Sequence, residues 1–573
     1  MTESPSNPPT PSQATLERNL VALAGVDPLL FERLTWPVAS DHVRVLADGA
    51  WQFRVHKTWH PLEPGGRLLD GLVKTGLETA ATSIGTPRRA LLLGIGSGAL
   101  VERLLHVPEL REVRAWERDP WLLRLALSCF DLAGAIASRR LRLLLTTDLI
   151  GQRSSGSAVF AHPFLGSVYG RELLHMDAPL GKGAVALAAG GLFVDQVGSE
   201  LTARGFTPWT IDLEVLSEEE VAHSLRYLNP RFLVAINYTQ GLAKLSQDHG
   251  LPVRVWEVDP ASSPPRNEGV STAGLHLFTH AHDNVEPWRA AGFEHVSYLA
   301  LAADPAVRKG DDSAPKKLEY GLTFVGQSLA GNAAVLGGRF LSTFGAWRGE
   351  AADAEARELL SKLVAGQRAH FQESVIPELL EEYAPGFRAT ATGPLALEDP
   401  AVLAGELAAS EKRLTCIAAL GEFSPNVWGD EGWRQLESHG TVYHGPAGHG
   451  AELTRIYDQS TINLDVGRLY QAGIVTMRVF DALSCGSLVL TERNAALEQL
   501  FDVESEVATY SSLKELINKS RYFLEHPKEA LETAARGRDA VLARHTIAQR
   551  VDVILDGLLG RPGQALECTN PLL

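Results

Sequence analysis

Residues 455–492 constrain the fold of this 573-residue chain more strongly than any other stretch. Alternating apolar residues predict a strand, a polar segment with glycine follows it, and apolar residues at helical spacing come next. Thr476 is suited to begin that helix as its N-cap, and Gly486 is suited to end it. The predicted elements are a strand over 461–466, a loop over 467–475, the helix, and a strand over 487–491. This order is one turn of a doubly wound parallel sheet, in which ligands bind beyond the carboxyl ends of the strands.

Two charged residues, Arg478 and Asp481, stand near the start of the predicted helix. A helix N-terminus carries exposed N–H groups and partial positive charge, and it therefore suits a diphosphate. Arg478 offers a bidentate contact to phosphate oxygens, and Asp481 offers an acceptor for ribose hydroxyl groups. A surface arginine and an aspartate that favours the helix dipole would give the same pattern. The local pattern leaves both interpretations open.

The same stretch resembles a known family. Residues 477–492, MRVFDALSCGSLVLTE, resemble the donor-site signature of GT-B glycosyltransferases, in particular the spore-maturation (CgeB-like) glycosyltransferases. That family reads Met-Arg-x-Phe-Glu-Ala-x-x-Cys-Gly, then a short strand and Thr-Glu, and YDQSTINL at 457–464 also fits its pattern. Asp481 stands where the family usually has Glu, which keeps the charge but shortens the reach. The resemblance implies a nucleotide-sugar site at Arg478 and Asp481.

A carboxyl-terminal donor domain is predicted over 318–560, after a charged, turn-rich linker. A strand over 322–325 runs directly into Gly326. This junction resembles the family's Phe-Val-Gly loop, which lies against the donor phosphates. His444 and His449 have no acid or cysteine at ligand spacing, so we expect no metal site.

An acceptor domain is predicted over 183–305. Asn237, Asp259 and His280 each follow a predicted strand, and the carboxyl ends of strands carry the sites of doubly wound sheets. Such residues also start loops for purely structural reasons. The segment VWEVDP resembles the Trp-x-x-Asp strand of the CgeB-like N-terminal domain. We therefore name Asp259 as the candidate general base, if the reaction inverts the sugar configuration.

Residues 30–178 resemble a class I methyltransferase core. Gly94 and Gly96 form a glycine loop after a strand, Glu117 ends the next strand, and Asp148 follows the third. The resemblance implies a loop for S-adenosylmethionine and an acid for its ribose. However, the post-strand segment at 159–163 lacks the Asn/Asp-Pro-Pro-Tyr of amino-group methyltransferases. The unit is closer to the methyltransferase-like domains found beside bacterial flagellin or surface-glycan glycosyltransferases. A structural or docking role is favoured over binding of S-adenosylmethionine.

Composition narrows the classes of function. A formal net charge of −16 argues against a nucleic-acid partner. The four cysteines lack CxxC spacing, which fits a reducing cytoplasm. The longest apolar run, at 184–194, is too short to span a bilayer. The polar, proline-rich start predicts a disordered tail over 1–29.

The sequence thus predicts an α/β chain, with two Rossmann-like GT-B domains preceded by a methyltransferase-like Rossmann domain. The expected activity is transfer of a hexose from a nucleotide sugar, foremost a UDP-sugar, to a protein or surface glycan. No bound metal is required if helix N-termini and Arg478 neutralise the diphosphate. Two alternatives stay open. One is a bifunctional methyltransferase–glycosyltransferase, and the other is an inactive scaffold of a glycan pathway.

Overall fold

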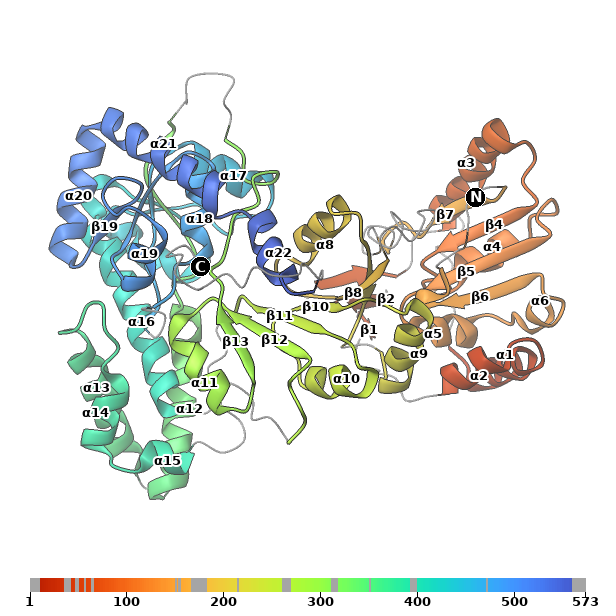
Figure 1. The fold of residues 1–573 in the computed structure, drawn as a ribbon, viewed down its shortest axis with the longest axis horizontal. Coiled ribbons are helices and arrows are strands. Elements are labelled where there is room, and N and C mark those ends of the chain that lie inside the picture. The colour runs from red at the N-terminus through yellow and green to blue at the C-terminus, as the bar shows by residue number, and fades with distance from the viewer. Residues whose placement is uncertain are drawn as a thin grey trace. The chain divides into compact units, whose positions relative to one another are not determined.

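The fold was described from a computed structural model, shown in Figure 1. The described residues are 11–35, 43–46, 51–55, 58–62, 66–149, 152, 156–165, 169, 183–213, 216–259, 269–310, 318–349, 352–391, 399–469 and 473–558. The chain divides into two compact units, Met1–Ile236 with Lys244–Arg254, and Asn237–Ala243 with Val255–Leu573. Parallel sheets with helical crossovers occur in both units, and the first unit also has an antiparallel sheet in the order β1-β2-β3. The parallel sheets confirm the predicted α/β fold class of Rossmann-like domains. The predicted domain boundaries stay predictions.

A helix begins inside the range of the predicted tail, whose residues 1–10 lie outside the described residues. Helix α1 (Gln13–Val26) lies within the described part of 1–29, so the prediction of disorder over that range is wrong from residue 13 onward. Its Asn19 side chain is buried and donates to the carbonyl oxygens of Leu127 and Phe130 at 2.6 and 2.7 Å. Asn19 also accepts from the Leu132 backbone N–H at 2.8 Å. These bonds fix the helix to a distant segment, which local composition does not reveal.

The first parallel sheet has the order β6-β5-β4-β7. Because β4 is the first of these strands in the chain, the crevice where the strand order reverses lies between β4 and β7. The elements of this part are α1, α2 (Pro28–Thr35), β1 (Val43–Val45), β2 (Trp51–Val55), β3 (Thr58–Pro61), α3 (Gly66–Ile84), β4 (Arg89–Leu93), α4 (Ala99–Leu105), β5 (Glu112–Glu117), α5 (Pro120–Cys129), α6 (Ala133–Ala137), β6 (Leu141–Leu145) and β7 (Ala158–Ala161).

The second sheet has the order β13-β12-β11-β10-β8-β9. Strand β8 pairs in parallel with both β9 and β10, and β12 pairs in parallel with β13. Its elements are β8 (Ala184–Ala188), α8 (Val194–Ala203), β9 (Thr207–Ile211), α9 (Glu218–Leu228), β10 (Leu233–Ile236), α10 (Leu242–His249), β11 (Val253–Glu257), β12 (Leu275–Thr279), α11 (Val285–Ala290) and β13 (His295–Tyr298).

The third sheet has the order β16-β15-β14-β17-β18-β19, and all its strand pairs are parallel. This is the doubly wound order 3-2-1-4-5-6, so its switch point lies between β14 and β17. Its strands are β14 (Tyr320–Val325), β15 (Asn426–Trp428), β16 (Val442–Tyr443), β17 (Ser460–Leu464), β18 (Leu488–Glu492) and β19 (Ala508–Tyr510). The helices after β16 are α17 (Ala451–Asp458), α18 (Met477–Ser484), α19 (Ala495–Leu500), α20 (Leu513–Glu525), α21 (Pro527–Arg544) and α22 (Ile547–Leu555).

Within the described residues, five α-helices, rather than the usual one, lie between β14 and β15, before a short 3-10 helix at Gly421–Phe423. They are α12 (Ala330–Arg348), α13 (Asp353–Gln367), α14 (Ile376–Tyr383), α15 (Phe387–Ala391) and α16 (Pro400–Ala419). Figure 1 shows them as a group in green to teal, with α13 and α14 packed beside α12 and α16. Phe340, Phe344, Leu363 and Phe387 form part of their own buried core, which also takes in Leu469 from the loop after β17. The helical group therefore packs against a loop at the switch point.

Within the described part of the chain, no helix is both long and apolar enough to cross a membrane.

Candidate functional site

The candidate site lies at the switch point of the third sheet, where Gly326 follows β14 and Asp465 follows β17. Helix α18 begins here, with Thr476 as its N-cap residue in extended conformation. The Thr476 hydroxyl does not cap the helix but donates to Asp465 Oδ1 at 2.9 Å. Gly486 follows the helix with a φ of +68°, a left-handed conformation that favours glycine. The predicted start and end of this helix are confirmed.

Arg478 joins the two strand ends. Its Nη1 forms an ion pair with Asp465, and its Nε donates to the carbonyl oxygen of Val325 at 2.8 Å. The guanidinium lies 4.8 Å from the ring centroid of Phe324, which adds a cation–π contact. A Cβ atom at Gly326 would stand 2.8 Å from Arg478 Nη2, so glycine leaves room for this side chain. The structure thus brings the predicted residues Arg478 and Gly326 together.

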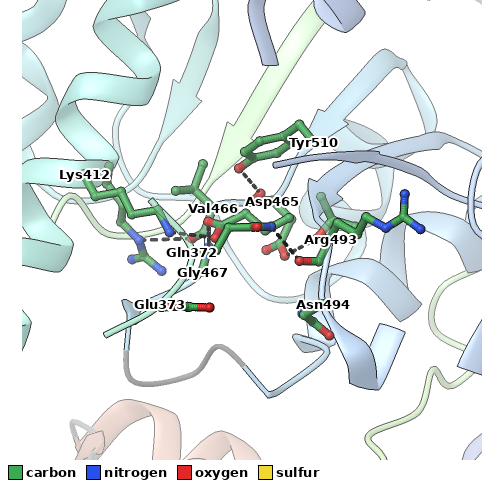
Figure 2. Close-up of polar contacts among 12 residues, drawn as sticks. Gln372, Glu373, Lys412, Asp465, Val466, Gly467, Arg493, Asn494 and Tyr510 are labelled. Carbon is green, nitrogen blue, oxygen red and sulfur yellow. Dashed lines mark hydrogen bonds and ion pairs between the residues drawn. The ribbon is translucent and has the colours of Figure 1, made fainter. Parts of the chain in front are cut away.

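Asp465 is the central acid of the site, and the sequence reasoning missed it. Its side chain is only 4% exposed, and its Oδ2 accepts from the Thr491 hydroxyl at 2.8 Å. Figure 2 shows the Tyr510 hydroxyl directed at the Asp465 backbone, to whose carbonyl oxygen it donates at 2.8 Å. The position of Asp465 immediately after a strand was the signal that could have identified it. The same signal singled out Asp259.

A second arginine, Arg413 on α16, spans the same two strand ends. Its Nη1 donates to the carbonyl oxygen of Gln327 at 2.8 Å, and its Nε donates to that of Val466 at 3.2 Å. Burial, together with the nearby Arg478 and Arg468 guanidinium groups, lowers the pKa of Arg413 to about 10. Arg413 therefore stays charged at neutral pH. Its place in the middle of a helix gave no local signal of function.

A buried ion pair lies beside these arginines. Lys412 Nζ contacts Glu492 Oε2 at 2.6 Å, and Glu492 Oε1 accepts from the Gly467 backbone N–H at 3.0 Å. Burial raises the pKa of Glu492, and the Lys412 ammonium opposes that rise. In Figure 2, Lys412 and Gly467 lie on the same side of the strand ends as Gln372. Gln372 Nε2 donates to the carbonyl oxygen of Arg493 at 2.7 Å, so the helical group and β18 are linked here.

Asp481 has a partner that the sequence did not suggest. Its carboxylate is 6% exposed, and its Oδ2 accepts from Arg308 Nε at 2.9 Å. The rest of that guanidinium donates to the carbonyl oxygens of Gly450 and His449 and to the Thr454 hydroxyl. Burial raises the pKa of Asp481, while Arg308 lowers it. A ribose contact by Asp481 stays a prediction, and the ion pair gives this residue a structural role as well.

The predicted acceptor residues meet at the carboxyl ends of β10 and β11. Asn237 Nδ2 donates to Asp259 Oδ2 at 2.8 Å, and Asp259 is exposed. Trp256 points away into the core, where its Nε1 donates to the Leu299 carbonyl oxygen at 3.2 Å. The buried acid at this edge is Glu257, which accepts from the Tyr238 backbone N–H. Burial raises the pKa of Glu257 to about 7.

His280 belongs to the same strand edge, after β12. It is buried, and its Nδ1 lies 3.0 Å from the Glu257 carbonyl oxygen. Burial lowers the pKa of His280. The sequence named Asp259 as the candidate base at this edge, and the structure adds Glu257, a buried carboxyl group with a raised pKa.

The glycine loop of the first sheet is covered by the chain's own side chains. Gly94 and Gly96 have φ angles of +83° and +58°. A Cβ atom at Gly96 would stand 2.6 Å from His162 Nε2, and one at Gly94 would stand 3.3 Å from the Tyr169 ring. His162 ends β7, across the reversal point from the loop, and burial lowers its pKa to about 4. A neutral histidine thus lies against the glycines.

Glu117, the predicted ribose acid, is fully buried beside this loop. Its Oε2 accepts from the Ile95 backbone N–H at 2.8 Å, and its Oε1 accepts from the Arg118 N–H at 2.8 Å and from the Tyr169 hydroxyl. Burial raises the pKa of Glu117. The Asp148 carboxylate forms an ion pair with Arg33, whose Nη1 lies 3.1 Å from Asp148 Oδ2. Both acids serve contacts within the protein.

Comparisons with known proteins match part of the segment that forms the third sheet. A family model described as "Glycosyl transferase-like" matches residues 411–556, which include Arg413, Asp465 and Arg478. That segment is therefore similar to glycosyl transferase-like proteins. No curated protein sequence matches the chain.

Several solved structures are similar to the chain at low identity. HepE from Anabaena in complex with UDP-glucose has 10% identity and a TM-score of 0.39, over 66% of this chain and 99% of its own. A glycosyltransferase from Rickettsia africae has 9% identity and a TM-score of 0.40, over 66% and 99%. The MAf glycosyltransferase from Magnetospirillum magneticum has 16% identity and a TM-score of 0.22, over 53% and 60%.

Proposed function

We propose that the protein is a glycosyltransferase that moves a hexose from a nucleotide-sugar donor, foremost a UDP-sugar, to a protein or surface-glycan acceptor. The observation that carries the proposal is the glycosyl transferase-like match over 411–556, which contains β17, Asp465 and α18 at the switch point of the third sheet. The CgeB-like resemblance of 477–492 supports the same subtype. A cytoplasmic location belongs to this proposal, because nucleotide sugars are its substrates.

The donor diphosphate is proposed to lie against Gly326 and the start of α18. Glycine at 326 permits close approach of the phosphates to the backbone. Arg478, held by Asp465 and Val325, supplies a fixed positive charge where negative charge develops on the leaving diphosphate. A preoriented guanidinium needs no reorganisation during the reaction. Among the described residues, no cluster of metal-ligating side chains was found.

The acceptor is proposed to lie at the edge formed by Asn237, Asp259 and Glu257. Two carboxyl groups with different surroundings stand here, one exposed and one buried. The pKa of Glu257, raised by burial to about 7, suits a general base near neutral pH. Asp259 has the better access to an attacking hydroxyl group. Either acid can take the proton if the reaction inverts.

The amino-terminal domain is proposed to have a structural or docking role. His162 and Tyr169 lie against the glycine loop, and both carboxylate oxygens of Glu117 accept hydrogen bonds from the protein. These contacts favour a closed, ligand-free loop over one that binds S-adenosylmethionine.

Release of free nucleotide from sugar donors tests the proposal. The full chain is incubated with UDP-glucose, UDP-N-acetylglucosamine, GDP-mannose and CMP-sialic acid, and free UDP, GDP or CMP is measured. We expect slow release from at least one UDP-sugar, and loss of that release in Arg478→Ala. Release from none of the donors, by folded protein that binds no nucleotide, would contradict the proposal.

A further inference from the structure

The switch point of the third sheet carries more positive charge than one donor arginine explains. Arg413, Arg468 and Arg478 lie close enough for the latter two to lower the pKa of the first. Two acids compensate them, because Asp465 pairs with Arg478 and Glu406 Oε1 lies 3.2 Å from Arg468 Nη1. Lys412 and Glu492 neutralise each other. An excess of one positive charge therefore remains at a buried strand edge.

Arg413 and Arg478 are placed in matching ways. Each uses Nε and Nη1 to join a group at or just after the end of β14 to a group just after β17. Both guanidinium groups face the Phe324 ring, at 5.9 and 4.8 Å from its centroid. Within the described part of the chain, neither Nη2 group donates to a protein acceptor. Neither Nη2 atom is among the described side-chain atoms that are both buried and without a hydrogen-bond partner, so each keeps access to solvent. Both can therefore donate to an anion that enters from solvent.

We propose that Arg413 is a second phosphate-binding residue, and that Arg413 and Arg478 together select donors with two phosphates over donors with one. This inference rests on the proposed function. The two guanidinium groups at the switch point come from different helices, α16 and α18, and they offer one Nη2 donor to each phosphate of a nucleoside diphosphate. A nucleoside monophosphate sugar leaves one of them without a partner. The helical group α12–α16 thus supplies part of the donor site through its last helix.

The alternative is that Arg413 only ties two loops together. A buried arginine with that role exists elsewhere in the chain and serves as a matched control. Arg550 on α22 is 6% exposed, and it donates to the carbonyl oxygens of Ala300 and Leu301 at 2.8 and 3.0 Å. It resembles Arg413 in burial and in its carbonyl partners. It stands on a different element from the switch point.

The experiment compares binding of UDP, UMP and uridine by calorimetry to the full chain and to Arg413→Lys, Arg413→Gln and Arg550→Lys. We expect Arg413→Lys to weaken the binding of UDP by about 10-fold or more and the binding of uridine by less than about 3-fold. The binding of UMP should weaken less than that of UDP. Arg550→Lys should lower the melting temperature and leave the ratio of UDP to uridine affinity unchanged. Arg413→Gln keeps donors for the loop carbonyl oxygens, so it replaces the lysine variant if that variant does not fold.

If the folded Arg413 variants bind UDP and uridine more weakly by the same factor, the inference is overturned. The glycosyltransferase proposal would still stand. If the wild-type chain binds neither UDP nor GDP, the inference and the proposed function both fail. Tighter binding of UMP than of UDP by the wild-type chain would also overturn the proposed selection for donors with two phosphates.

Discussion

Arg478 is the residue on which the proposed chemistry depends most. Its contact with the leaving diphosphate should strengthen as the glycosidic bond breaks, because negative charge grows there. We expect Arg478→Ala to lower kcat by roughly 10- to 150-fold, since a hydrogen bond with a charged group contributes about 1.5–3 kcal/mol. Arg478→Lys should recover only part of the rate, because lysine lacks the planar fork. Steady-state kinetics measure this, and an unchanged kcat in folded Arg478→Ala would place the donor phosphates elsewhere.

Asp481 shows how the structure changes an expectation for a single residue. From the sequence alone, its loss should raise the KM for donor and leave kcat nearly intact. Because Asp481 is buried against Arg308, its removal leaves a buried cation without its acid. We expect Asp481→Ala to lower the free energy of unfolding by about 3–5 kcal/mol, measured by chemical denaturation.

The exposed pair Arg521–Glu422 is the control for Asp481. Its side chains are 43% and 52% exposed, so Glu422→Ala should cost about 1 kcal/mol or less. Asp481→Glu keeps the charge and restores the residue usual in the family, so it should retain most donor binding. Equal stability of Asp481→Ala and wild type would show that the Arg308 pair contributes nothing to folding.

Glu257 gives the stability of the protein a pH dependence of defined sign. Burial raises its pKa in the folded state to about 7, above the ordinary value of 4.5. Its contribution to stability is therefore complete below about pH 4.5 and is lost as the pH rises through about 7. We expect the melting temperature of wild type to fall more steeply with pH across this window than that of Glu257→Gln. Parallel curves for the two proteins would mean that Glu257 is not buried in its neutral form.

At the scale of elements, the loop between β4 and α4 decides whether the amino-terminal domain binds a cofactor. His162 and Tyr169 lie against its glycines, and the Glu117 carboxylate accepts four hydrogen bonds from the protein. We expect no heat of binding when S-adenosylmethionine is titrated into the full chain, and no S-adenosylhomocysteine after incubation. Binding with micromolar affinity would contradict the structural role and favour a bifunctional enzyme.

Helix α18 shows what local sequence can predict. Its beginning at Thr476 and its end before Gly486 follow from the N-cap preference, the apolar spacing and the freedom of glycine, all of which are local. The strand ends at Asn237 and Asp259 were found in the same way, and their hydrogen bond follows from parallel pairing. The hydrogen-bond partners of Asp465 and Asp481 could not be predicted from the local sequence. Thr491 and Arg308 lie 26 and 173 residues away in sequence, and only the folded sheet brings them near.

At the scale of the whole molecule, an acidic chain is proposed to bind an acidic donor. The formal net charge of −16 repels a nucleotide sugar at long range. The local excess of positive charge at Arg413 and Arg478 must therefore act at short range, where little water screens it. The five helices between β14 and β15 carry Arg413 to that position, so an insertion far from the signature motif contributes to the site.

Thermal unfolding of the full chain with UDP, GDP, CMP and S-adenosylmethionine tests the central claim most directly. A ligand at 100 times its dissociation constant adds about 2.7 kcal/mol of stability, which gives a clear rise in melting temperature. We expect UDP to stabilise the wild-type chain, Arg478→Ala to lose most of that effect, and S-adenosylmethionine to give none. Stabilisation by S-adenosylmethionine with no response to any nucleotide would contradict the assignment of the third sheet as a sugar-donor domain.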